Sequence, residues 1–205
     1  MVLSAVYFAG VGKVFLTNKK IITIWYMVAM VFIAAGVVTG VLYYVYNFLK
    51  TAEIKNYLDG YTNSLRNGMN LSNLVKTALK SNSFLFFAIA LSSFFRFGPF
   101  VSGFFLIRKG FISAFTTAAM IDVYGFSGLI LAGGSFIQIV LLIPILAVFA
   151  AASVFCSKNR HSFEKRDKII YIIFLAIVFT IFCSCALLEG IITTTFMKWL
   201  AFRVT

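Results

Sequence analysis

The chain has 205 residues, of which 61% are hydrophobic and 12% are charged, and its mean hydropathy is +0.99. Because a soluble domain carries about twice this charged fraction, the composition excludes an ordinary soluble fold and indicates an integral membrane protein. The formal net charge of +12 suits nucleic acid or anionic lipid headgroups. Since the basic residues lie in short loops between apolar blocks and form no nucleic-acid motif, we expect membrane lipid and not nucleic acid as the partner.

Five apolar segments approach or exceed the length of about 20 residues that a helix needs to cross a bilayer. They cover residues 21–48, 84–107, 111–124, 129–155 and 169–188. We therefore expect an all-α fold, a polytopic bundle of about five transmembrane helices that forms one integral membrane domain over residues 1–205. The third segment is short, and only the GFSG loop separates it from the fourth. These two are expected to form an antiparallel hairpin, either crossing fully or re-entrant.

The remaining segments predict the orientation. Residues 1–12 carry no signal-peptide pattern, so a short helix along the inner membrane surface is expected there. The loop at 49–83 has apolar residues at helical spacing and predicts amphipathic helices on the outer surface. Lys and Arg are more frequent on the side of the N-terminus, including Arg108, Lys109 and the basic loop at 156–168. We expect the N-terminus in the cytoplasm and the C-terminus outside.

Residues that could carry catalysis are few. Ser127 in GFSG matches the Gly-x-Ser-Gly nucleophile pattern of rhomboid-type intramembrane proteases, but the only histidine, His161, is expected on the opposite side of the membrane. Cys156, Cys183 and Cys185 lie in or beside apolar segments without further ligands, so we expect buried thiols and neither a disulfide nor a metal site. The sequence favours a protein that is not an enzyme, with no catalytic residue, cofactor or metal.

Four polar residues lie in apolar surroundings: Arg96, Asp122, Gln138 and Glu189. Arg96 is near the middle of the second predicted span, where a charge costs at least about 2.5 to 3.5 kcal/mol, so a partner is expected, with Asp122 or Glu189 as candidates. Asp122 and Glu189 are otherwise predicted at outer helix ends, in contact with headgroups or water. These four residues are the candidate intramembrane polar or partner-contact positions.

Candidate helix-packing positions are Gly36 and Gly40, because GVVTG has the small-xxx-small spacing that lets two membrane helices approach closely. Pro144 is a further candidate helix-packing position, which rests on the family resemblance described next.

Three segments resemble the stage II sporulation protein M family and the wider superfamily named after it, over about residues 79–202. They are ALKSNSFLFFAIALSSF, with Asn82 at the family's Asn position; the central block from Arg108 to Phe149, with its GFSG turn, Gln138 and Pro144; and LLEGIITTTFMKW, with Glu189 in the family's closing acidic motif. The chain departs from the family's pattern at Thr194, where a proline is usual, and keeps only a Gln and a Pro in FIQIVLLIP.

The resemblance implies a role in endospore formation. It implies a membrane scaffold that recruits two single-pass peptidoglycan hydrolases, stage II sporulation proteins D and P, during engulfment. The implied location is the septal and engulfing membrane of the mother cell, and association between copies of the chain stays open. The alternative, drawn from the wider superfamily, is an accessory membrane subunit of a transporter or of peptide export.

Overall fold

The structure, a computed structural model, describes residues 19–46, 53–54, 56, 60, 71–137, 142–158 and 165–203. Its elements are α2 (Lys19–Tyr46), α4 (Leu71–Ser92), α5 (Gly98–Ile137), α6 (Ile143–Lys158) and α7 (Lys165–Arg203). Every regular element within these ranges is helical and none is a strand, which confirms the all-α prediction.

Three of these helices are long and apolar enough to cross a membrane, over Lys20–Tyr46, Gly98–Leu129 and Lys168–Leu188. Helix α6 is apolar but shorter. The three helices are compatible with the multi-pass membrane protein that the composition indicates, whereas the count of about five crossings stays a prediction.

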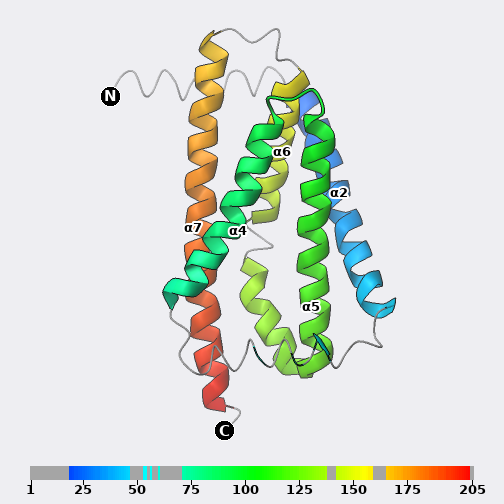
Figure 1. Ribbon diagram of the computed structural model, residues 1–205, viewed down its shortest axis with the longest axis vertical. Helices are drawn as coiled ribbons and strands as arrows, with labels where there is room; N and C mark the ends of the chain where they lie inside the picture. Colours follow the sequence, from blue (N-terminus) through cyan, green and yellow to red (C-terminus); the bar gives the residue numbers. More distant parts are fainter. Residues whose placement is uncertain are drawn as a thin grey trace.

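The helices form an elongated bundle in which α2, α5 and α7 follow the long axis and α4 lies obliquely between α7 and α5 (Figure 1). Helix α6 packs against α2, α4 and α5. One end of the bundle, at the top of Figure 1, holds the starts of α2 and α7, the end of α6 and the turn between α4 and α5. We call it the basic end, because these segments carry Lys20, Lys168, Lys158 and Arg96.

Aromatic rings form the centre of the core between α4, α6 and α7. The Phe86 ring of α4 stacks on the Phe149 ring of α6, with centroids 5.1 Å apart and an interplanar angle of 12°. The rings of Phe179 and Phe182 on α7 lie 5.1 Å and 5.9 Å from Phe86. Because lipid tails are as apolar as these side chains, close packing rather than exclusion from water stabilises such a core.

Glycines bring α2 and α5 into direct backbone contact. A Cβ atom on Gly36 would meet the carbonyl oxygen of Ile107, and one on Gly40 would meet that of Phe111. From the other helix, a Cβ atom on Gly110 would meet the carbonyl oxygen of Ile33. The GVVTG segment therefore lies at a helix contact that leaves no room for a larger side chain.

The second and third helices have other boundaries than the predicted spans 84–107 and 111–124. The chain turns at residues 93–97, so one helix ends at Ser92 and the next begins at Gly98. The Ser92 hydroxyl donates to the carbonyl oxygen of Ile89 at 2.7 Å, and such bonds compete with continuation of a helix. Pro99, which lacks an N–H group, then occupies the first turn of α5, where that loss is tolerated.

Other boundaries also differ from the prediction. Helix α4 takes in residues 71–83 of the predicted outer loop, and α7 continues beyond residue 188 to Arg203. The chain reverses at Gly125, which has a positive φ of 56° (Figure 1). Helix α6 extends to Lys158 and α7 starts at Lys165, which shortens the predicted loop at 156–168. Residues 1–18 lie outside the described residues.

Candidate functional site

Of the four predicted intramembrane polar residues, the structure describes the side chains of Arg96 and Asp122, and these two lie far apart. Arg96 is exposed in the turn at the basic end, not in the middle of a helix. Asp122 lies about 36 Å along α5 from Gly98, at about 1.5 Å of rise per residue. The expected pairing of Arg96 with Asp122 therefore does not occur. Glu189 belongs to α7, but its side chain lies outside the described residues, as does the whole of Gln138.

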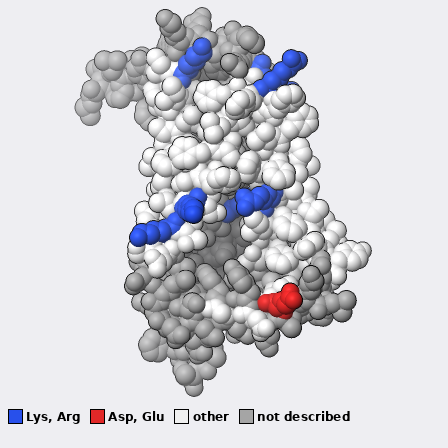
Figure 2. Space-filling view, in the orientation of Figure 1, with Lys and Arg blue, Asp and Glu red and all other residues white. Residues whose placement is uncertain are grey.

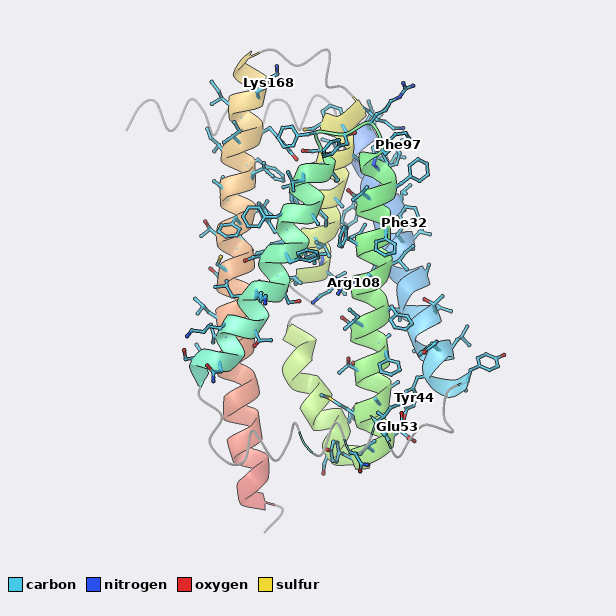
Figure 3. All side chains as sticks on the ribbon, viewed as in Figure 1. Phe32, Tyr44, Glu53, Phe97, Arg108 and Lys168 are labelled. Atoms are coloured by element: carbon cyan, nitrogen blue, oxygen red, sulfur yellow. The ribbon has the colours of Figure 1, made fainter. Side chains whose placement is uncertain are left out.

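Asp122 has a different partner, which the sequence did not suggest. The Tyr44 hydroxyl donates a hydrogen bond of 2.7 Å to Oδ2 of Asp122. Tyr44 is buried, and its ring meets the edge of Phe115 at a centroid distance of 5.6 Å. This pair joins the end of α2 that lies away from the basic end to the part of α5 just before its reversal at Gly125 (Figure 3).

A buried hydroxyl network, the serine cluster of Ser92, Ser102 and Ser153, joins α4, α5 and α6. The Ser92 Oγ lies 2.8 Å from Ser102 Oγ and 3.3 Å from Ser153 Oγ. The Ser153 hydroxyl donates to the carbonyl oxygen of Ile89 at 2.8 Å. All three residues are at most 2% exposed. The polar atoms of the cluster are thus used within the protein, and they hold the end of α4 against its neighbours.

Two further polar atoms are buried, one on α4 and one on α7. Nδ2 of Asn82 and the hydroxyl of Tyr171 make no hydrogen bond within the part of the chain that the structure describes. Asn82, which the family resemblance singles out, is 2% exposed on α4. The remaining packing candidate, Pro144, is exposed in the first turn of α6, a position that suits a residue without an N–H group.

Three exposed cations lie at about mid-height along the bundle, although the sequence analysis predicted them in aqueous loops. Lys76 and Lys80 are exposed on α4, and Arg108 is exposed on α5. Figure 2 shows basic side chains in two groups, one at the basic end and one across the middle, with acidic side chains further down. We call Lys76, Lys80 and Arg108 the middle cations. Arg108, expected in a cytoplasmic loop with Lys109, instead points away from α5 at mid-height (Figure 3).

The described acidic side chains do not neutralise this charge. Glu53 and Asp122 lie toward the end opposite the basic end (Figure 3), and no ion pair joins a described acid to any of the middle cations. The sequence does show that Lys76 and Lys80 are four residues apart and would share one face of a helix. The predicted span boundaries nevertheless assigned both lysines to an aqueous loop.

The three cysteines are free thiols, half-buried at Cys156 and Cys183 and buried at Cys185. Comparison of the chain with protein-family models, with curated proteins and with solved structures finds no match. The resemblance to the stage II sporulation protein M family therefore stays a prediction from the sequence motifs.

Proposed function

We propose that the chain is a non-enzymatic membrane scaffold of endospore formation, as the sequence resemblance implies. In this role it recruits the single-pass hydrolases, stage II sporulation proteins D and P, and anchors them at the septal and engulfing membrane. The chain crosses the membrane about five times, with its N-terminus in the cytoplasm and its C-terminus outside.

The outward side of α2 carries this proposal. Helix α2 contacts α5 through Gly36 and Gly40, which leaves its opposite side uncovered. That side has an apolar residue at each seventh position, an outer stripe that is 57–67% exposed and consists of Ile24, Val31, Val38 and Val45. Residues seven positions apart lie on one edge of a helix, so the outer stripe offers one continuous apolar edge against which the helix of a single-pass membrane protein can pack.

The test adds bulk to the outer stripe while keeping it apolar. The double variant Val31→Trp with Val38→Trp is compared with Ile172→Trp, a control on α7 whose residue is 61% exposed. Affinity purification from sporulating membranes should recover both hydrolases with wild type and the control, and much less of them with the double variant. Equal recovery with all three proteins, or cleavage of peptidoglycan by the purified chain alone, would contradict the scaffold.

The middle cations favour a second candidate, an accessory subunit of a transporter or of peptide export, because isolated intramembrane charges are typical of transport pathways. The two candidates differ in when the protein is made. Production only in the mother cell after asymmetric division supports the scaffold, whereas production in vegetative cells together with co-purifying transporter subunits supports the second candidate.

A further inference from the structure

Contacts between the helices relate depths on one helix to depths on the next. The Ser92 Oγ atom of α4 lies 2.8 Å from Ser102 Oγ of α5 and 3.3 Å from Ser153 Oγ of α6, so the three residues share one depth, which we call the serine level. From there α4 and α6 run toward the basic end and α5 runs away from it (Figure 1). With about 1.5 Å of rise per residue, other depths can be counted from the serine level.

The tyrosine end of α2 lies at the depth of the α4 lysines. Lys80 lies about 18 Å from the serine level along α4, which is oblique, and Phe115 lies about 20 Å from it along α5. The Tyr43 ring of α2 packs between Phe111 and Phe115, with centroids 5.6 Å and 6.1 Å away. Lys80 and Tyr43 are therefore at nearly equal depth. From Lys20, at the basic end, α2 covers about 34 Å to Tyr43.

A second path from the basic end to Lys80 has the length of a bilayer's hydrocarbon core, which is about 30 Å. On α7, Lys168 lies about 21 Å before Phe182. The Phe182 ring lies 5.9 Å from the Phe86 ring of α4, and Lys80 is about 9 Å further from the basic end on that helix. Together the two helices cover about 30 Å, in agreement with the length measured along α2.

The surface between these two depths, which we call the apolar band, exposes large apolar side chains. Those on α4 and α5 are 54–79% exposed and include Phe84, Phe87, Leu91, Phe100 and Phe104. Figure 2 shows the band without charge between the two groups of basic side chains. Of the described charged residues, only Arg108 and Lys109 start within the band, in its outer half, about 9 to 11 Å from the serine level. Long basic side chains near a boundary extend toward the headgroups.

Helix α6 begins at the same depth as Lys80. Ile143 lies about 9 Å before Phe149, whose ring stacks on that of Phe86 at 5.1 Å. The first N–H groups of a helix have no partner within it, so they are costly in hydrocarbon, whereas water satisfies them at the boundary. From this start α6 runs about 24 Å to Lys158 and covers most of the band, although it is shorter than α2.

We propose that the outer boundary of the hydrocarbon core lies at the depth of Lys80, Tyr43 and the start of α6, so that lipid acyl chains cover the apolar band. Lys76 and Lys80 lie among the headgroups of the outer leaflet and pair with lipid phosphates, and Arg108 extends its side chain toward them. The terms inner and outer follow the proposed orientation, whereas the depth itself does not depend on it.

Beyond this depth the chain forms a cap outside the membrane. On α5, Asp122 and the reversal at Gly125 lie about 10 and 15 Å past Phe115. Cations that reach the headgroups are not isolated intramembrane charges, so this position removes the observation that favours the transport candidate. The scaffold proposal is tested separately by recovery of the hydrolases.

The first experiment places a lysine at two depths of the outer stripe. Val31 and Val45, 67% and 60% exposed, lie on either side of Val38, which is near the level of Arg108. A hydrocarbon core centred on the middle cations would put both valines at equal depth, whereas the proposal puts Val31 near the centre and Val45 at the boundary. Val31→Lys should therefore lower the membrane abundance of the full chain severalfold, and Val45→Lys should not. Equal abundance of the two variants, in a host that lacks the hydrolases, would overturn the proposal.

The second experiment measures depth in vesicles of phosphatidylcholine and phosphatidylglycerol. The native cysteines of the full chain are replaced by serine, and a nitroxide is attached to single cysteines at Lys80, Phe87, Phe104 and Phe126. Phe126 follows the reversal and is 77% exposed. Collisions of each nitroxide with oxygen, which concentrates in hydrocarbon, are compared with collisions with a water-soluble nickel complex.

Oxygen should dominate at positions 87 and 104 and the nickel complex at position 126, with position 80 between them. Circular dichroism identifies a variant that folds poorly, and positions 87 and 104 report on the apolar band from two different helices, so either one is sufficient. A nitroxide at position 80 that is better protected from the nickel complex than those at 87 and 104 would overturn the proposal. The same holds for a nitroxide at position 126 that collides mainly with oxygen.

Discussion

The Tyr44 hydroxyl and Oδ2 of Asp122 are joined by a 2.7 Å hydrogen bond across 78 positions of sequence. This bond fixes the end of α2 that lies away from the basic end. Toward the middle, Gly36 and Gly40 hold the same helix against the α5 backbone. At the basic end, Lys158 Nζ lies 4.3 Å from the centroid of a tryptophan ring on α2, in cation–π contact. Helix α2 is thus attached to the bundle at three levels.

Removal of the tyrosine hydroxyl should loosen the attachment at Asp122. We expect Tyr44→Phe to lower the free energy of unfolding by about 1 kcal/mol, because the ring still packs while one hydrogen bond is lost. Tyr46→Phe is the control, since Tyr46 is 83% exposed and its hydroxyl has no described partner. Unfolding in detergent followed by circular dichroism measures both variants, and equal stability of the two would show that the bond contributes nothing.

A methyl group at the α2–α5 contact should separate the two helices. Gly36→Ala places a Cβ atom on the Ile107 carbonyl, so we expect a loss of about 1 to 3 kcal/mol, as is usual for overpacking. Gly133→Ala is the matched control, because the added Cβ would meet no atom of another described segment within 4 Å and alanine favours a helix. A Gly36→Ala protein as stable as the control would contradict the close contact.

The serine cluster should contribute to stability through its internal bonds. Ser92→Ala leaves the buried Ser102 hydroxyl without its 2.8 Å partner, and we expect a loss of about 1 to 2 kcal/mol. Ser184→Ala serves as the comparison, since that exposed hydroxyl donates to the Thr180 carbonyl of its own helix. The unfolding temperatures of the two variants should differ, with Ser92→Ala the lower.

The sequence predicts the class of fold well, because long apolar runs with few charges leave helices as the means of satisfying the backbone in a membrane. Helix boundaries were less predictable. Apolar composition alone continues from Phe84 to Ile107, and the turn between them is decided by Ser92 and Ser93, which bond to their own backbone, and by Pro99. Pro99 in the sequence indicates this break, since a helix rarely continues through the residue that precedes a proline.

The turn between α4 and α5 also reverses the predicted positions of two arginines, since Arg96 was expected within a span and Arg108 in a loop. A helix that ends at Ser92 places Arg96 at the basic end, and a helix that starts at Gly98 carries Arg108 into the middle of the bundle. Contacts between distant segments, such as Tyr44 with Asp122, could not be read from spacing within one helix. The GVVTG spacing, in contrast, is local and places Gly36 and Gly40 on one face of α2 before any partner is known.

The position of Arg96 gives the most direct test of the helix boundaries and the orientation. The turn at residues 93–97 places Arg96 at the basic end and carries Arg108 to mid-height along the bundle. Cys156, Cys183 and Cys185 are replaced by serine, and single cysteines are introduced at Arg96, Lys168 and Glu53. In intact cells an impermeant thiol reagent should label position 53 only, and after permeabilisation it should label positions 96 and 168 equally. A cysteine at position 96 that resists the reagent in both preparations, as a residue in the middle of a membrane helix would, or that is labelled from outside together with position 53, would contradict the account.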